Sequence, residues 1–171
     1  MGNLTTRETL ALRWAEVCND PTLRDLPYKI ELNAFGTIEA GARNNRRARL
    51  QGRIAHELAS QLPNGGVLTE CPILTDIGVR VPDVAWASND FLARHGEATP
   101  FPEAPEICVE IRSPSNSQEE LALKSQAFLA AGAREVRVVS EDGDLTVHDA
   151  AGRRETSAYP VVLVLPPRHK A

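Results

Sequence analysis

The sequence predicts a mixed α/β domain in which helices flank one central β-sheet. Three observations favour this fold class. Several short runs alternate apolar and polar residues as half-buried strands do, three longer segments have helical features, and 171 residues are enough for one domain with a sizeable core. We therefore expect a single domain over residues 1–171.

Three segments have the features of helices. Residues 5–18 begin with a threonine and a glutamate at capping-box spacing. Residues 44–62 place leucine and isoleucine side chains four apart along one face, while the other face is rich in arginine. Residues 116–131 follow a plausible cap at Ser115 or Asn116 and end just before a glycine. These segments should cover the faces of the sheet.

The predicted strands lie between and after these helices. Residues 89–105 show no periodicity and predict a long loop, which is usually functional or mobile. We find no internal repeat and no linker. The strands are expected at 28–32 and 37–40, which form a hairpin, at 66–74, 78–88 and 106–112, and as C-terminal strands that continue to about residue 165.

Composition excludes several classes of protein. No apolar run approaches the roughly 18 residues of a membrane span, and the N-terminus has no signal-peptide pattern, so we expect a soluble, cytoplasmic protein. Three widely separated cysteines predict reduced core thiols rather than disulfides or a zinc site. No glycine-rich phosphate loop or Gly-x-Ser-x-Gly elbow is present, and no organic cofactor is indicated. The net charge of −4 gives no overall attraction to nucleic acid.

Two acidic residues interrupt apolar strands. Asp83 lies within "VRVPDVAWA", and Glu110 lies within "EICVEIR". A buried carboxylate is costly unless it is paired, hydrogen-bonded or bound to a cation. Two such acids on neighbouring strands suit Mg²⁺ or Mn²⁺, which bind one or two carboxylates and keep several waters. Taken singly, each acid is more often a structural ion-pair partner.

Two basic residues accompany this pair. Arg112 is two residues from Glu110 and shares its face of the strand, where it would bind a phosphate or orient Glu110. Lys124 falls within the apolar stripe that its helix would press on the sheet, so it must reach either solvent or a carboxylate. Lys124 pointing at Asp83 and Glu110 would favour an enzyme, and Lys124 pointing to solvent would favour a binding module.

The ordered motifs resemble a known nuclease family. "VPDVAW", then "PEICVEIRSPS", the helix "EELALKSQAFLAAGA" and the strand "REVRVVSEDG" are similar to the Uma-type restriction endonucleases of the PD-(D/E)XK superfamily. The resemblance covers residues 26–150 or so and implies a restriction-endonuclease-like core. The chain departs from the family pattern at "VRVVSED", and it carries Phe128 where tyrosine is usual.

The resemblance implies roles for individual residues. Asp83 and Glu110 would hold the metal ion together with the backbone carbonyl of Ile111, and Glu31 matches an acid of the family that would assist metal binding. Arg112 stands where the superfamily usually has a lysine, and Lys124 matches a lysine on the following helix. The implied activity is metal-dependent hydrolysis of DNA, in which Lys124 orients the attacking water and Arg112 supports it.

Five arginines at the start of the helix 44–62 are the candidates for DNA contact. A solvated basic face is an equally good interpretation of this cluster. Two alternatives to the enzyme stay open: an inactive DNA-binding or protein-interaction module in which Glu110 and Arg112 pair, and a structural homodimer formed through the apolar tail 159–165. The arginines are Arg43, Arg46, Arg47, Arg49 and Arg53.

Overall fold

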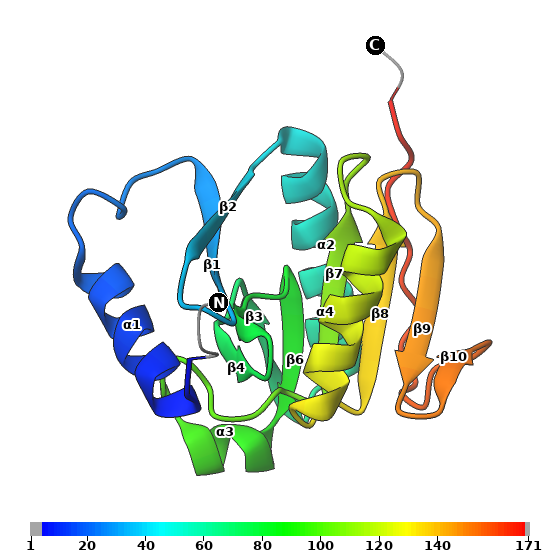
Figure 1. The fold of residues 1–171 in the computed structure, drawn as a ribbon. Helices are drawn as coiled ribbons and strands as arrows, with labels where there is room; N and C mark the ends of the chain where they lie inside the picture. Colours follow the sequence, from blue (N-terminus) through cyan, green and yellow to red (C-terminus); the bar gives the residue numbers. More distant parts are fainter. Residues whose placement is uncertain (1–4, 170–171) are drawn as a thin grey trace.

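Two β-sheets and four helices make up the part of the chain that the structure, a computed structural model, describes (Figure 1). That part is residues 5–169, so both ends of the predicted domain, 1–4 and 170–171, lie outside the described residues. The fold class is mixed α/β, as the sequence predicts. Within residues 5–169, no helix is long and apolar enough to cross a bilayer.

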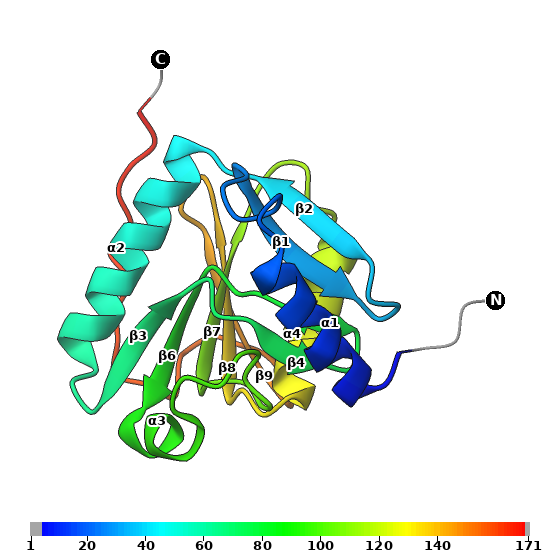
Figure 2. The same ribbon diagram turned by 90° about the vertical axis from the view of Figure 1, so that its left-hand side faces the viewer.

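The larger sheet has six strands in the order β10-β9-β8-β7-β6-β3. Strands β7 and β8 are parallel and joined through helix α4, while the other neighbours are antiparallel. Helix α2 covers one face of this sheet and α4 covers the other (Figure 2). These elements are β3 (Gly65–Thr69), β6 (Val84–Ser88), β7 (Ile107–Arg112), β8 (Glu135–Ser140), β9 (Leu145–Asp149), β10 (Gly152–Arg154), α2 (Asn45–Gln61) and α4 (Gln118–Ala130).

Both faces of strand β7 are buried. Ile107, Val109 and Ile111 pack in the cluster beneath α2, where Leu50, Ile54 and Leu58 of the helix press on the sheet. Cys108 packs in a second cluster with Phe128 of α4. Because side chains two apart share a face, Glu110 points toward the α4 side with Cys108 and is only 2% exposed. Successive side chains of β7 therefore point into two different buried layers, one beneath α2 and one beneath α4.

The smaller sheet has the order β2-β1-β5-β4 and is antiparallel throughout. Helix α1 packs on it through Leu10, Trp14 and Val17, which meet Leu32 and Val79 of the sheet. The predicted hairpin is the β1–β2 pair of this sheet. The elements are α1 (Arg7–Asn19), β1 (Tyr28–Asn33), β2 (Ile38–Ala42), β4 (Ile73–Thr75) and β5 (Gly78–Arg80).

The predicted central mixed sheet flanked by helices is confirmed, but two of the predicted strand runs each divide between it and the smaller sheet. The run 66–74 leaves the large sheet after β3, at Glu70 with a φ of 53°, and enters the small sheet as β4. The run 78–88 makes the reverse change between β5 and β6, at Val81 to Asp83. Pro82 has no N–H to donate to a strand ladder, which accounts for the break there. Asp83 consequently lies in a bend between the two sheets, and not inside a strand as expected.

The expected loop 89–105 contains a helix, α3 (Asn89–His95). The Ser88 hydroxyl accepts a hydrogen bond from the Phe91 amide and caps this helix, and the Phe91 ring is 1% exposed. The Ser88 cap and the buried Phe91 ring therefore stabilise a helix of 7 residues, which is too short for hydrophobic periodicity to reveal.

The expected final strand at 159–165 is also absent from the described residues, where the last strand is β10. The tail instead lies along α2, and side chains of that helix donate hydrogen bonds to its backbone carbonyls. Val161 is buried while Val162 and Val164 are 69% and 58% exposed, so the tail is extended but is not paired with another strand.

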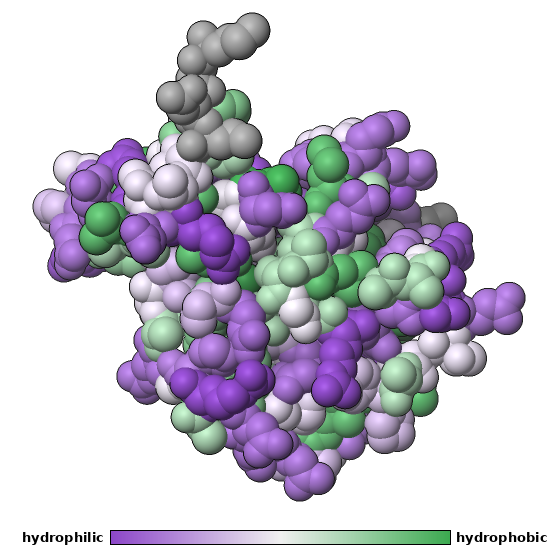
Figure 3. Space-filling model, turned by 60° about the horizontal axis from the view of Figure 1, so that its bottom comes forward, coloured by the Kyte–Doolittle hydropathy of each residue, from purple (hydrophilic) through white to green (hydrophobic). Residues whose placement is uncertain are grey.

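Hydrophilic residues spread across the face shown in Figure 3, with hydrophobic residues in small groups between them. Apart from Val162 and Val164 of the tail, the large hydrophobic side chains that are exposed come from separate elements, among them Leu12 of α1 and Leu123 of α4. Isolated exposed apolar residues of this kind are ordinary on protein surfaces and carry no functional conclusion.

Candidate active site

Asp83 lies where strands β6 and β7 diverge. The antiparallel register that joins Val84 to Val109 would place Pro82 opposite Ile111. At that point the Ile111 amide donates a 2.7 Å hydrogen bond to Asp83 Oδ2 instead of to a neighbouring strand. The carboxylate therefore takes the place of a strand partner for the Ile111 amide at the end of the β6–β7 ladder. This hydrogen bond helps to hold the Asp83 side chain in place, and the residue is only 1% exposed.

Two cations from different elements neutralise Asp83. Arg47 of α2 places its Nη2 2.8 Å from both carboxylate oxygens, and Lys29 of β1 places its Nζ 3.1 Å from Oδ1. Gln51, one turn further along α2 from Arg47, donates to the backbone carbonyl of Asp83 at 2.9 Å. Each carboxylate oxygen thus accepts charge-assisted hydrogen bonds, which is the arrangement that a buried acid requires.

Glu110 is less well satisfied. Its Oε1 lies 3.1 Å from Lys124 Nζ and 3.9 Å from Lys29 Nζ. These two ammonium groups are the neighbours of Oε1, and the residues that the structure describes supply no further hydrogen-bond donor to it. A buried carboxylate oxygen in this condition has room for a further donor or cation.

Lys124 reaches the site from helix α4. Its Nζ lies 3.0 Å from Glu31 Oε1 and 3.1 Å from Glu110 Oε1, so it joins the two sheets. The "SPS" turn before α4 is held by hydrogen bonds from Ser113 to the Asn116 side chain. The N-cap of α4 is Ser117, and not Ser115 or Asn116 as expected. Lys124 therefore points at carboxylates rather than at solvent, although not at Asp83.

The three carboxylates respond differently to this environment. Burial favours the neutral acid in each, but Lys29 and then Arg47 hold the pKa of Asp83 below its ordinary value, and Lys124 and Lys29 do the same for Glu31. For Glu110 the burial is complete and outweighs Lys124 and Lys29, so its pKa is raised. Burial alone would lower the pKa of Lys124, but Glu110 and Glu31 raise it.

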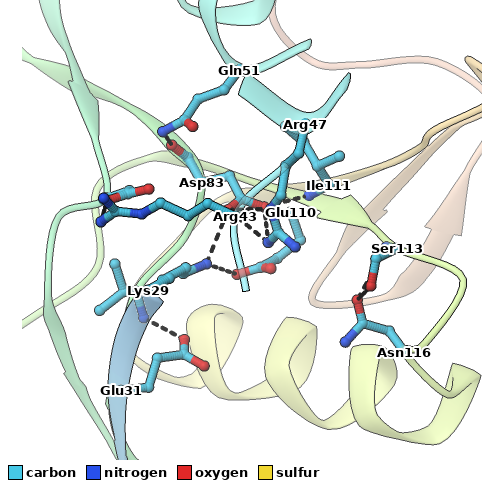
Figure 4. Close-up of polar contacts among 12 residues, drawn as sticks. Lys29, Glu31, Arg43, Arg47, Gln51, Asp83, Glu110, Ile111, Ser113 and Asn116 are labelled. Atoms are coloured by element: carbon cyan, nitrogen blue, oxygen red, sulfur yellow. Dashed lines mark hydrogen bonds and ion pairs between the residues drawn. The ribbon is translucent and has the colours of Figure 1, made fainter. Parts of the chain in front are cut away.

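The cluster opens onto a small cavity of about 160 Å³. Figure 4 shows the Lys29 ammonium between the Asp83 and Glu110 side chains, with Arg47 above them and with Glu31 on the same strand as Lys29, β1. Of the residues expected at the site, the structure brings together Asp83, Glu110, Lys124 and Glu31. Ile111 contributes its amide to Asp83, and its carbonyl as a metal ligand stays a prediction.

Arg112 lies elsewhere. It lines a different cavity on the other flank of α4, together with residues of β8 and β9 such as Val138 and His148. Within the described residues it forms no ion pair with Glu110, so the expectation that these two residues pair is wrong. Helix α4 separates Arg112 from the Glu110 cavity, because Leu121 lies between the two cavities and lines both of them.

The five arginines of residues 43–53 have separate roles. Arg47 binds Asp83, and Arg46 donates to the carbonyls of Glu141 and of Pro166 in the tail. Arg53 donates to Val164 of the tail. Arg43 forms an exposed ion pair with Glu70, and Arg49 is exposed with no side-chain hydrogen bond among the described residues. Contact with DNA stays a prediction, best suited to Arg43 and Arg49.

Sequence analysis missed Lys29 and Gln51 and assigned Arg47 to the surface. The available signal for Lys29 was its spacing of two from Glu31, which puts both residues on one face of β1. Alternation alone does not show what this charged face meets, and in the structure it packs on the charges of the other sheet and of α4. Gln51 follows Arg47 by four residues, which places both on one face of α2.

The residues of this cluster are of the kind that binds Mg²⁺ or Mn²⁺. Asp83 and Glu110 supply oxygen ligands, and the unsatisfied Glu110 Oε1 has capacity for a cation. Among residues 5–169, no three acidic, histidine or cysteine side chains already surround a single metal position. An ion would thus be held by Asp83 and Glu110, with Glu31 nearby, and water would complete its coordination.

Comparison with protein-family models identifies the family of this chain. Residues 20–167 match the family model Uma2, which is described as "Putative restriction endonuclease". The chain belongs to this family. The Uma2 match includes every residue of the cluster described above, from Lys29 to Lys124. No curated protein gives a significant match to the chain.

A solved structure has a fold similar to that of this Uma2 chain. It is described as "a putative nuclease belonging to DUF820" from Anabaena variabilis ATCC 29413. The TM-score is 0.60, the sequences are 17% identical, and the similar region covers 70% of this chain and 71% of that chain. At this identity the likeness establishes the shared fold, which is that of a nuclease-like α/β protein.

Proposed function

We propose that this Uma2 protein hydrolyses phosphodiester bonds of DNA, using Mg²⁺ or Mn²⁺ held by Asp83 and Glu110. Membership in a family of restriction endonucleases supports nuclease chemistry. The observation that carries the assignment to this site is Lys124, which leaves the apolar face of its helix to lie 3.1 Å from Glu110 Oε1. Two close ion pairs, to Glu110 and Glu31, offset the cost of burying this lysine and hold its ammonium beside the expected metal ligand.

The residues of the cluster would divide the work. A bound divalent ion would supply an activated water and offset negative charge on the scissile phosphate. Lys124 has a raised pKa and stays protonated, so it would orient the water and stabilise charge and would not accept a proton. Arg47 keeps Asp83 ionised and fixed, ready to act as a ligand. Arg112 has no part in this arrangement.

The DNA backbone would approach the open side of the cavity. Arg43 lines the cavity, and Arg49 is exposed further along the same basic segment. Their contacts with phosphate would be independent of DNA sequence and sensitive to salt. The net charge of −4 makes such a local cluster necessary for binding.

Plasmid cleavage in Mg²⁺ or Mn²⁺ tests the proposal directly. Asp83→Asn and Lys124→Met are expected to lower the cleavage rate by at least about a hundredfold, since each removes charge from the reacting centre. Leu123→Ala changes an exposed neighbour on α4 and is the matched control, expected to cut at the wild-type rate. Circular dichroism and a melting curve establish that each variant is folded.

Arg112→Met decides which basic residue serves the site. A loss that is smaller for Arg112→Met than for Lys124→Met supports the assignment to Lys124, and the opposite order would overturn it. Cleavage that is absent from every protein, or equal in all of them, would contradict the nuclease proposal itself.

A binding module without catalysis is the second candidate. One observation favours it: the carboxylates Asp83, Glu110 and Glu31 are matched by the cations Lys29, Arg47 and Lys124, and Arg80 at the edge is matched by Glu39, so the cluster is neutral without any metal. This candidate predicts salt-dependent DNA binding that is unchanged by Mn²⁺ and is never followed by cleavage.

A homodimer through the tail is a separate proposal that concerns assembly alone. Val162 and Val164 give the tail an exposed apolar edge. Light scattering on the wild-type chain and on Val162→Ser with Val164→Ser measures the mass directly. A monomeric wild-type protein would exclude this proposal.

A further inference from the structure

We propose that Lys29 occupies the metal position between Asp83 and Glu110, so that a divalent ion binds only when the Lys29 ammonium withdraws. The inference rests on the proposed function, because it concerns the same site. It makes Lys29 a positioning residue that sets how tightly the site holds metal.

The first step is geometric. Lys29 Nζ is 3.1 Å from Asp83 Oδ1 and 3.9 Å from Glu110 Oε1, so it donates a hydrogen bond to Asp83 and lies within ion-pair distance of Glu110. The Lys29 side chain is only 9% exposed, which places the ammonium inside the cluster and not at its rim. A Mg²⁺ ion binds carboxylate oxygens at about 2.0–2.1 Å and needs the space between them. The ammonium and the ion therefore exclude each other.

The second step is electrostatic. The carboxylates and the cations of the cluster already balance one another: Asp83, Glu110, Glu31 and, at the edge, Glu39 are matched by Lys29, Arg47, Lys124 and Arg80. An added divalent ion would leave two uncompensated positive charges among buried groups, where repulsion is strong. Withdrawal of one ammonium halves that excess. The cation that contacts both expected ligands is Lys29.

The other two cations are less suited to leave. Arg47 holds both oxygens of Asp83 through its guanidinium and is anchored on α2. Lys124 contacts Glu110 and Glu31 but not Asp83, so it can remain on Glu31 when Glu110 turns toward an ion. Lys29 has neither a fork of donors nor a second partner at short range.

Lys29 also has a place to go. The cavity that it lines is bordered at its mouth by Glu39, which pairs with Arg80, and by Glu70, which pairs with Arg43; the side chains of these acids are 48% and 29% exposed. A lysine side chain has four flexible carbons, so a change of rotamer can carry the ammonium from the buried pair to these acids at the mouth. The backbone of β1 need not move.

Manganese titration without DNA tests this inference, with calorimetry as the readout. Lys29→Gln removes the competing charge and is expected to bind Mn²⁺ at least about tenfold more tightly than the wild type. Lys29→Arg keeps the charge and is the matched control, expected to bind no more tightly than the wild type. Adding Asp83→Asn to Lys29→Gln removes a ligand and should abolish the gain.

A second measurement uses the wild-type protein, in case Lys29→Gln fails to fold. Lys29 and Lys124 are the two lysines among the described residues, and both are buried. Acetylation followed by mass spectrometry should show Lys29 protected without Mn²⁺ and several-fold more reactive with saturating Mn²⁺. Lys124 should stay protected in both conditions and serves as the internal reference.

The outcomes separate this inference from the proposed function. Wild-type Mn²⁺ binding that Lys29→Gln does not tighten, or a Lys29 that stays protected when Mn²⁺ is bound, would overturn the role of Lys29 and leave the metal-dependent nuclease intact. The absence of Mn²⁺ binding from both the wild type and a folded Lys29→Gln would contradict the metal site, and with it both proposals.

Discussion

Two buried charge clusters in this protein look alike by composition and differ in their surroundings. Glu135 and Arg137 of β8 are 3% and 1% exposed and pair at 2.6 Å, and Ser157 and the Ala158 amide complete the bonds to Glu135. In the cluster of Asp83 and Glu110, the charges are equally buried, but Glu110 Oε1 lacks a hydrogen bond and a cavity adjoins it.

The difference shows that burial of charge does not identify a functional site. The Glu135–Arg137 pair is satisfied on all sides, and its Ser157 and Ala158 partners fix the start of the C-terminal tail. Its role is structural. The Asp83–Glu110 cluster combines an unsatisfied oxygen, carboxyl groups whose pKa values shift in opposite directions, and access from outside. Those three properties together favour chemistry.

The largest expected effect concerns the structural pair. Arg137→Met leaves Glu135 as an uncompensated buried charge and should lower the free energy of unfolding by about 3–5 kcal/mol. Urea denaturation followed by circular dichroism measures the change. The double variant Glu135→Leu with Arg137→Met removes both charges and should regain most of the loss. A single variant as stable as the wild type would refute the structural role.

A smaller loss of stability is expected at the candidate active site. Arg47→Met removes the hydrogen bonds of a guanidinium to Asp83, but Lys29 and the Ile111 amide remain on that carboxylate. The free energy of unfolding should fall by about 1.5–3 kcal/mol in the same urea experiment. A loss as large as that of Arg137→Met would mean that both clusters depend equally on a single cation. It would contradict the distinction between a structural pair and a candidate active site.

Dependence on pH separates the two carboxylates within the site. The pKa of Glu110 is raised above its ordinary value of 4.5, so its contribution to stability is present below that pH and is lost as the pH rises through the raised pKa. The pKa of Asp83 is lowered below 3.8, so its contribution is present above that pH and is lost as the pH falls through the lowered pKa.

Glu110→Gln should therefore gain stability relative to the wild type as the pH rises above about 4.5. Asp83→Asn should lack the decrease in stability that protonation of the Asp83 carboxylate causes in the wild type at acid pH. Urea denaturation of both variants between pH 3 and pH 8 measures this. Parallel curves for the wild type and Glu110→Gln would show that Glu110 is an ordinary ionised residue, like a surface carboxylate.

The smallest expected effects distinguish two arginines of the basic segment. Arg46→Ala removes hydrogen bonds to Glu141 and the tail and should cost about 1 kcal/mol of stability. Arg49→Ala should change stability by less than about 0.5 kcal/mol but lower the salt dependence of DNA binding by about 0.9 in the log–log slope. Fluorescence anisotropy at several salt concentrations measures that slope, and an unchanged slope would remove Arg49 from the DNA interface.

Local pattern was sufficient for the helix 45–61 and for the hairpin, because each depends on neighbours in the sequence. Local pattern also singles out Asp83 and Glu110, because a charge among apolar strand residues needs a partner wherever the strand lies in the fold. Lys124 followed from its position on the apolar stripe of α4. These features required no knowledge of which elements meet.

The remaining features depend on contacts between distant segments. Alternation in β1 shows that Lys29 and Glu31 share a face, but only the docking of the two sheets buries that face against Asp83 and Glu110. Arg112 shares a strand face with Glu110, yet the path of α4 over the sheet puts them in different cavities. The change of sheet at Pro82 is likewise set by the pairing of β5 with β1 and β4.

The division of the site between two sheets has a consequence for folding. Lys29 and Asp83 are 54 residues apart, and Lys124 and Glu31 are 93 residues apart. Contacts of such long sequence separation close large loops, so they form slowly relative to the local helices and hairpin. The six charges can therefore meet only after both sheets exist and have docked. A newly synthesised or partly unfolded chain would hold these charges apart, so the proposed site would form only at the last step of folding.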